Sequence, residues 1–220
     1  MARLSKNGLV AKKVGMTRIE VQDGTLIPVT LLQVAQQQVT KIMETKKDGY
    51  SGYQVGYQAK SLKNLNKADV HRLRKSGIED NYSKFSEFRI PEDAKYELGT
   101  VLTAKIFDDA STVDVTGLSK GRGFQGAVKR WNASIGRMTH GSRFHRRPGS
   151  LGQCTSPGRV FKNKHQPGHM GDVNVTVTNM KVVDVDVENN IIALKGSVPG
   201  SREGFLELRE SAAGSKNKKA

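Results

Sequence analysis

Between Asp114 and Asp172 the chain carries no carboxylate at all. The 57 residues in between, 115–171, hold eleven lysines and arginines, four of the five histidines, eleven glycines and three prolines. An even spread of the 21 acidic residues would place about five in a window of this length. Eleven cations without internal counter-charge repel one another, and a segment this poor in aliphatic residues cannot bury them. The negative charge must therefore come from outside the segment, and a polyphosphate backbone is its natural source.

The basic character of the chain is concentrated in this window. The formal net charge is +15, of which +11 lies in 115–171, leaving 25 basic against 21 acidic residues elsewhere. A solvated charged face normally mixes both signs, so a window of one sign indicates a binding element rather than a generally cationic surface. The remaining length suits one large domain or two small ones with a real core.

The chain shows few signs of export or membrane insertion. Its single cysteine, Cys154, excludes an internal disulfide and fits a reducing compartment. No apolar run approaches the ~20 residues of a membrane span. The basic N-terminus has no acid before Glu20, but Gly8 and Gly15 interrupt any amphipathic helix, so we expect mature protein near an anionic partner rather than a targeting peptide.

The residues outside the basic window read mostly as strands. Asp23-Gly24 and Asp48-Gly49 are hairpin signals between apolar runs, and Pro28 marks an edge position or a bulge. Asn66 can cap a helix over 67–75 that Gly77 would end. The predicted strands are 18–21, 26–34, 38–44, 53–57, 85–90, 101–107, 112–116 and 191–195.

Two valine rows follow the basic window, and each alternates with polar residues. Period-two alternation predicts strands buried on one face, as in an antiparallel sheet or barrel, with a turn at 189–190. Asp184 and Asp186 are then solvent-facing neighbours of buried valines rather than a metal-binding pair. The rows are Val173, Val175 and Val177, and Val183, Val185 and Val187.

The basic window thus interrupts a β domain, leaving it at Thr116 and returning near Val173. A connection of this length without a core should be functional or disordered. Ordering its backbone costs ~1–2 kcal/mol per residue, and its composition offers nothing to offset that cost. We therefore expect the window to be flexible alone and to order on RNA.

The window contains most of the side chains that we predict to bind RNA. Arginines bridge phosphates bidentately, lysines act as point charges, and histidines and aromatic rings stack on splayed bases or donate to phosphates. For Trp131, local packing beside Ala127 and Val128 is an equal alternative. The predicted RNA-binding set is Lys12, Lys13, Lys120, Arg122, Lys129, Arg130, Trp131, Arg137, His140, Arg143, His145, Arg146, Arg147, Arg159, Lys162, Lys164 and His165.

Other chemistry is weakly supported. The glycines at 121, 123 and 126 match a dinucleotide-binding pattern, but arginines and a histidine stand where the acidic ribose ligand belongs, so this turn is predicted to hold an RNA phosphate. The spacing of His165 and His169 suggests zinc, yet no Cys-x-x-Cys is present and the surrounding cations repel the ion. Ser142 or Cys154 near His145 lacks an acidic orienting residue within the window. We expect no metal, cofactor or catalytic site.

Several long motifs in series resemble one known family. The segments KKVGMTRI, VDVTGLSKGRGFQGAVKRW, HRRPGSLGQCTSPGRVFK, GHMG and LKGSVPG are similar to the third protein of the large ribosomal subunit in its bacterial form. Their order and spacing match from about Gly8 to Phe205. The resemblance implies a structural, non-enzymatic protein of the cytoplasmic ribosome that binds large-subunit (23S-type) rRNA directly and supports early subunit assembly. It implies no membrane and no small-molecule substrate.

The resemblance also implies the architecture. It predicts a mainly β fold in which residues 1–48, 90–117 and 172–210 form a six-stranded antiparallel barrel like that of other translation proteins. Residues 49–89 form a small α+β insertion, 118–171 a long irregular extension through rRNA, and 211–220 a flexible tail. The extension tip, Gly152, Gln153 and Cys154, approaches the peptidyl transferase centre. The implied neighbours are the fourteenth and nineteenth large-subunit proteins.

The tip departs from the family in two places. Some bacterial members carry a methylated glutamine where this chain has Thr155, so we expect no such modification. Cys154 stands where asparagine is common. Two other functions remain as alternatives: an RNA-modifying enzyme with a basic substrate clamp, and a translation factor that binds ribosomes reversibly.

Overall fold

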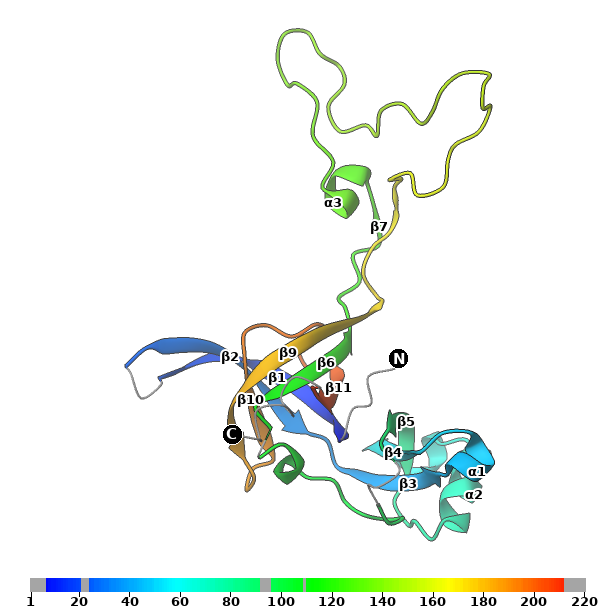
Figure 1. Cartoon of the computed structure of the whole chain (residues 1–220), viewed down its shortest axis with the longest axis vertical. Helices are drawn as coiled ribbons and strands as arrows, with labels where there is room; N and C mark the ends of the chain where they lie inside the picture. Colours follow the sequence, from blue (N-terminus) through cyan, green and yellow to red (C-terminus); the bar gives the residue numbers. More distant parts are fainter. Residues whose placement is uncertain (1–6, 21–23, 92–95, 109, 212–220) are drawn as a thin grey trace. The chain divides into compact units, whose positions relative to one another are not determined.

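The computed structural model describes residues 7–20, 24–91, 96–108 and 110–211, and most of its elements are strands (Figure 1). The chain divides into two compact units, one made of Met1–Leu118 with Asn174–Ala220 and the other of Ser119–Val173. No helix in the described ranges is long and apolar enough to cross a membrane. The predicted tail falls almost entirely outside the described residues.

Six strands of the first unit form an antiparallel sheet that closes on itself. Their order is β1-β11-β6-β9-β10-β2, and β2 pairs back to β1. Closure leaves no unpaired edge along the paired segments. The prediction of a mainly β chain with a six-stranded antiparallel sheet is confirmed. The strands are β1 (Gly8–Glu20), β2 (Leu26–Val34), β6 (Thr112–Leu118), β9 (Asn174–Asp186), β10 (Ile191–Lys195) and β11 (Phe205–Glu210).

The inward residues of these strands form one hydrophobic core. Alternation places Val113 and Val115 of β6 inside, and Leu206 and Leu208 of β11 pack with them. Strand β1 is longer than the predicted 18–21, whose last residue lies outside the described ranges with Asp23. On one side of β2, Pro28 pairs with Arg18 of β1. On the other side, the pairing of β2 with β10 ends at Val29, so Pro28 has no strand partner there and the predicted edge position is confirmed.

The predicted valine rows are confirmed only for Val177 and Val185, which pack against the core, and are wrong for the other valines. Strand β9 has irregular register opposite both neighbours, and Asn179 lies in the left-handed region at φ 57°. Each one-residue slip moves the following side chains to the other face. As a result Val182 packs with Val185 against the core in place of Val183. Of the first row only Val177 packs against the core, whereas Val173 and Val175 are exposed.

The predicted strand over 101–107 is also wrong. Val101 makes only an isolated bridge to Gln38, and a 3-10 helix, η2 (Ala104–Phe107), follows. Ala104 and Phe107 are both fully buried in the core. Residues three apart eclipse on a 3-10 helix but point to opposite faces of a strand, so burying both side chains selects the helix.

The region between β2 and β6 contains a second, three-stranded sheet. Strands β3 (Gln37–Met43), β4 (Gly52–Ala59) and β5 (Tyr82–Arg89) pair in that order, with α1 (Thr45–Asp48), η1 (Leu62–Asn64) and α2 (Lys67–Lys75) in their connections. Helix α2 is confirmed: the Asn66 side chain accepts from Ala68 N at 3.3 Å, and Gly77 follows at φ 75°.

Polar side chains join the three-stranded sheet to β1. The Gln37 amide accepts from Val10 N at 2.9 Å and donates to Val10 O at 3.0 Å, replacing a strand partner there. The Tyr53 hydroxyl accepts from Gly8 N at 2.8 Å and donates to Gly8 O. Burial raises the pKa of Tyr53, which keeps the hydroxyl protonated. Buried polar groups paired in this way fix the position of one sheet on the other.

Candidate RNA-binding surface

The unit Ser119–Val173 begins and ends in a hydrogen-bonded stem. Ser119 N donates to Val173 O at 2.9 Å, and Arg122 N donates to Met170 O at 2.8 Å. Beyond these bonds β7 (Phe124–Gln125) pairs with β8 (Gly168–His169). Gly171 has φ 76°, and a Cβ there would lie 2.1 Å from Lys120 O. Only glycine allows the two halves of the stem to approach this closely.

A cluster of four residues closes the far end of the stem. Helix α3 (Ala127–Trp131) carries Arg130 and Trp131, and each donates to Gln166 O at 2.9 Å. The His165 ring stacks on Trp131 with centroids 4.5 Å apart and planes 7° from parallel. The Arg130 guanidinium lies 5.0 Å from the centre of the Trp131 ring. We call Arg130, Trp131, His165 and Gln166 the Trp131 cluster, and it shows Trp131 in a packing role.

Residues 132–164 form a distal loop without helix or strand (Figure 1). Its internal bonds are few: Gly136 N donates to His145 O at 2.8 Å, and the Nδ1 atom of His145 lies 3.1 Å from Arg137 O. The tip residues Gly152, Gln153 and Cys154 are exposed. The Cys154 sulfur lies 3.6 Å from the Thr155 hydroxyl, whose hydrogen bond lowers the pKa of the Cys154 thiol.

This unit has almost no core. The structure describes every residue of Ser119–Val173, and Ala127 alone among them is buried. Large apolar side chains remain exposed, including Phe124 at 76% and Trp131 at 42%. Since burial of apolar area is the main favourable term in folding, this unit lacks the usual source of stability.

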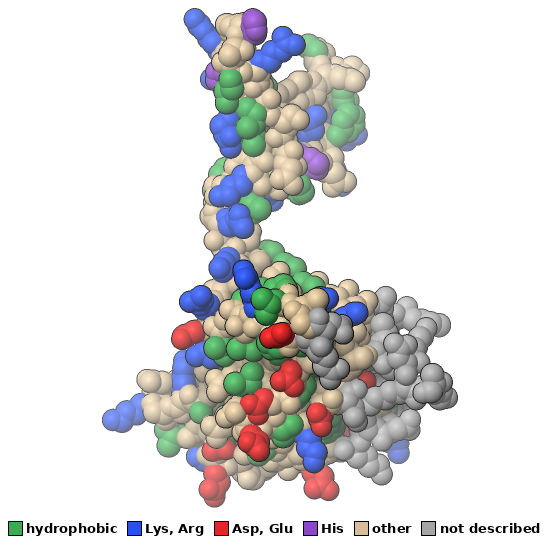
Figure 2. All heavy atoms as spheres, turned by 90° about the vertical axis from the view of Figure 1, so that its left-hand side faces the viewer, with side chains coloured by type: hydrophobic (Ala, Val, Ile, Leu, Met, Phe, Trp, Pro, Cys, Tyr) green, Lys and Arg blue, Asp and Glu red, His purple; other side chains and the backbone are tan. Residues whose placement is uncertain are grey.

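Most cations of the unit are solvent-facing, and none of them has an acidic partner in an ion pair. The five ion pairs found within the described ranges all lie outside 115–171. Figure 2 shows red Asp and Glu side chains gathered over the strands of the first unit. Arg130 and His145 are half-buried. The predicted residues that are exposed here are Lys120, Arg122, Lys129, Trp131, Arg137, His140, Arg143, Arg146, Arg147, Arg159, Lys162, Lys164 and His165.

The two predicted residues on β1 differ from this set. Lys13 is only 9% exposed, and its ammonium donates to Val198 O at 2.9 Å and Gly200 O at 3.3 Å. A lysine engaged in this way holds the loop before β11 and cannot reach a phosphate, so its prediction as an RNA contact is corrected. Lys12 is half-buried, with its ammonium 3.7 Å from Glu203.

The residues that suggested zinc and a dinucleotide are arranged differently from such sites. Within the described ranges, no group of three or more His, Cys, Asp and Glu is placed to hold a metal ion. In the glycine pattern, Arg122 N–H is used inside the stem, and the five-residue helix α3 has no side-chain cap. Sequence reasoning missed Gln166, which acts through its backbone carbonyl, and no side-chain pattern could have indicated it.

Comparison with known proteins places this geometry in a family. Residues 2–190 match the family described as ribosomal protein L3. The large ribosomal subunit protein uL3 of Alteromonas mediterranea is 48% identical over 197 residues, covering 88% of this chain and 92% of the relative. The uL3 proteins of Alkaliphilus metalliredigens and Vibrio campbellii are each 46% identical and cover 92% of this chain and 96% and 97% of their own lengths. The two-unit chain with its unpaired basic loop therefore belongs to the ribosomal protein L3 family.

Proposed function

We propose that this protein is a structural, non-enzymatic constituent of the large ribosomal subunit that binds rRNA directly through Ser119–Val173. Membership of the ribosomal protein L3 family supports the subunit and the structural role. The observation that carries the RNA-binding assignment is the set of eleven cations without ion pairs, in a unit with one buried residue. RNA supplies the counter-charge that the chain lacks.

The stem and the distal loop contribute differently to binding. The stem is already hydrogen-bonded, so Lys120 and Arg122 lie on backbone that is preformed. The loop of 33 residues has to be ordered, at a cost on the order of 30–60 kcal/mol for its backbone. Contacts with phosphates and bases on several sides offset this cost, as in other segments that fold on binding.

The finer picture follows from the family resemblance. The resemblance predicts that residues 1–48, 90–117 and 172–210 form a barrel of the translation-protein type that docks on the subunit, with 49–89 as its α+β insertion. Because β3 pairs with β4 in the three-stranded sheet, we place the start of the insertion before residue 49, at β3. Residues 118–171 enter the rRNA, with Gly152, Gln153 and Cys154 toward the peptidyl transferase centre. The protein takes part in early assembly beside the fourteenth and nineteenth large-subunit proteins, on cytoplasmic ribosomes.

Charge reversal tests which part of the chain binds RNA. Arg146→Glu with Arg147→Glu should reduce incorporation into large subunits on sucrose gradients by at least tenfold, because two loop cations would become repulsive to phosphate. Lys46→Glu with Lys47→Glu, two exposed positions on α1, is the matched control and should change incorporation less than twofold. Equal losses in both variants would contradict the loop as the binding element.

Limited proteolysis tests the ordering by RNA. We expect a protease to cut free protein within Ser119–Val173 and to leave the same segment intact in purified subunits.

Retention through moderate salt washes separates a core subunit protein from a reversibly bound factor, because simple phosphate binding weakens steeply with salt. Turnover on free rRNA by purified protein would instead support the enzyme alternative.

A further inference from the structure

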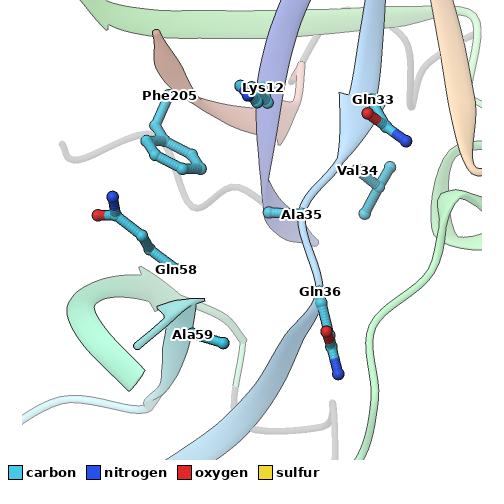
Figure 3. Close-up of a pocket in the computed structure, with 8 residues that line it drawn as sticks. All are labelled: Lys12, Gln33, Val34, Ala35, Gln36, Gln58, Ala59 and Phe205. Atoms are coloured by element: carbon cyan, nitrogen blue, oxygen red, sulfur yellow. The ribbon is translucent and has the colours of Figure 1, made fainter. Parts of the chain in front are cut away.

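A crevice of about 280 Å³ lies between the six-stranded sheet and the three-stranded sheet of the first unit (Figure 3). Lys12 of β1, Ala35 of the β2–β3 linker, Gln58 and Ala59 at the end of β4, and Phe205 at the start of β11 surround it. Figure 3 shows Gln33 and Val34 on the other side of that linker from Phe205 and Gln58. The bond from Ala35 N to Val10 O, 3.1 Å, holds the linker in place.

The lining combines an aromatic ring, amides and positive charge. Phe205 packs against Tyr57 with ring centroids 5.2 Å apart, and the Lys84 ammonium lies 5.5 Å from the Phe205 ring centre. Lys12 supplies a second ammonium, with Glu203 3.7 Å away. Among the described residues, no carboxylate lines the crevice itself. Glu203 offsets part of the Lys12 charge, and Lys84 contacts the Phe205 ring without lining the crevice, so the crevice is at most weakly cationic and favours a polar occupant.

Gln58 occupies an unusual backbone conformation at this crevice. Its φ of 60° lies in the left-handed region, which costs a non-glycine residue roughly 1–3 kcal/mol. The Ser83 hydroxyl donates to Gln58 O at 3.0 Å and lies 3.4 Å from Gln58 Oε1, and these contacts hold the residue there. Strained residues of this kind concentrate at ligand clamps, where they aim a side chain.

We propose that this crevice holds a single unpaired nucleotide of large-subunit rRNA, a contact separate from the basic loop. The proposal rests on the proposed function. A glutamine amide presents a donor and an acceptor that match a base edge, an aromatic ring supports a base face, and Lys12 and Lys84 attract its phosphates. The volume is just below the usual range for drug-sized ligands, which suits one base rather than a helix or a peptide.

A photo-cross-linking experiment on assembled subunits tests the occupant. Ala59 is exposed at the crevice, so we expect its replacement by p-benzoylphenylalanine to leave the fold intact. We expect irradiation of purified large subunits to cross-link this position to one or two neighbouring unpaired nucleotides. In subunits with Gln58→Ala, that base should react with base-specific chemical probes roughly fivefold to tenfold faster, as one lost hydrogen bond predicts. Lys84→Met is a second, independent variant in which the chemical reactivity of the same nucleotide is measured.

Lys63→Met is the control, because this exposed lysine of η1 does not line the crevice; reactivity should be unchanged. Cross-links to a protein, no cross-link, or a base-paired nucleotide whose reactivity neither variant alters would overturn the proposal. The amount of protein in the large-subunit fraction distinguishes a failure of the proposed function from a failure of the crevice proposal. Absence from that fraction contradicts the proposed function, whereas normal incorporation without a nucleotide in the crevice contradicts only the crevice proposal.

Discussion

Removing Trp131 should open the stem of the basic unit. Trp131 is the only tryptophan of the chain, and its ring joins α3 to the returning strand through His165 and Gln166 O. Because Ala127 is the one buried residue of this fully described unit, few other side chains can replace this contact. We expect Trp131→Ala to leave the six-stranded sheet folded while the stem frays.

The structure sets the size of the effect. Trp131 is 42% exposed, so roughly half of the ~200 Å² of a tryptophan side chain is covered, worth about 2.5 kcal/mol. The hydrogen bond to Gln166 O adds ~1 kcal/mol, and ring stacking ~0.5–1.5 kcal/mol. The unfolded chain already covers part of this area, so the net loss is about 3 kcal/mol. At ~1.4 kcal/mol per factor of ten, the stem should open on the order of 100-fold more often.

Amide hydrogen exchange of the free protein measures that opening. The amides of Arg122 and Met170, which bond across the stem, should exchange on the order of 100-fold faster in Trp131→Ala. Trp131→Phe keeps a stacking ring, so its amide exchange rates should lie between those of the wild type and Trp131→Ala. Phe124→Ala removes an aromatic side chain that is 76% exposed on the same stem and should change exchange less than threefold. If the Trp131→Ala amides exchange at the wild-type rate, the Trp131 cluster does not close the stem.

Three further changes test individual contacts. Gly171→Ala should raise exchange at the stem amides at least tenfold, because of its φ of 76° and the nearby Lys120 O, whereas Gly121→Ala, with its closest contact at 3.7 Å, should not. Thr155→Val should raise the pH midpoint of Cys154 alkylation by iodoacetamide, since the hydroxyl lowers the thiol pKa; an unchanged midpoint contradicts this cause. Hydrogen bonds from Asn189 lower the pKa of Asp186, so their stabilisation is present above about pH 3.8 and is lost as pH falls through the lower folded value. Asp186→Asn keeps an acceptor and should lack that acid-dependent part in urea titrations at pH 2.5–5.

Local sequence signals predicted the elements that depend on local chemistry. The Asn66 cap and Gly77 fix helix α2, and the second hairpin signal lies between the paired strands β3 and β4. The errors arise where tertiary packing decides. Ala104 and Phe107 are both buried in the core, which selects a 3-10 helix over the predicted strand. No local sequence pattern indicates that both side chains are buried in the core.

The predicted burial of the valines of β9 was partly wrong for a related reason. Strict alternation assumes an uninterrupted register, and a single left-handed residue such as Asn179 ends that assumption. Its backbone N–H bonds the Asp114 carboxylate at 2.8 Å, a partner 65 residues away in the sequence. Which valines of β9 point into the core therefore depends on a contact with a distant residue, and the local sequence of β9 does not reveal that contact.

The basic window was easier to predict because charge does not depend on register. A segment without acids remains unpaired within itself in any conformation, so composition alone indicates an external polyanion. Composition does not say which part of the segment is preformed. The Trp131 cluster and Gly171 supply that answer, since they hold the stem by ring stacking and close backbone approach rather than by burial. A preformed stem lowers the number of residues that RNA must order from the whole unit to the distal loop, and so reduces the entropy cost of binding.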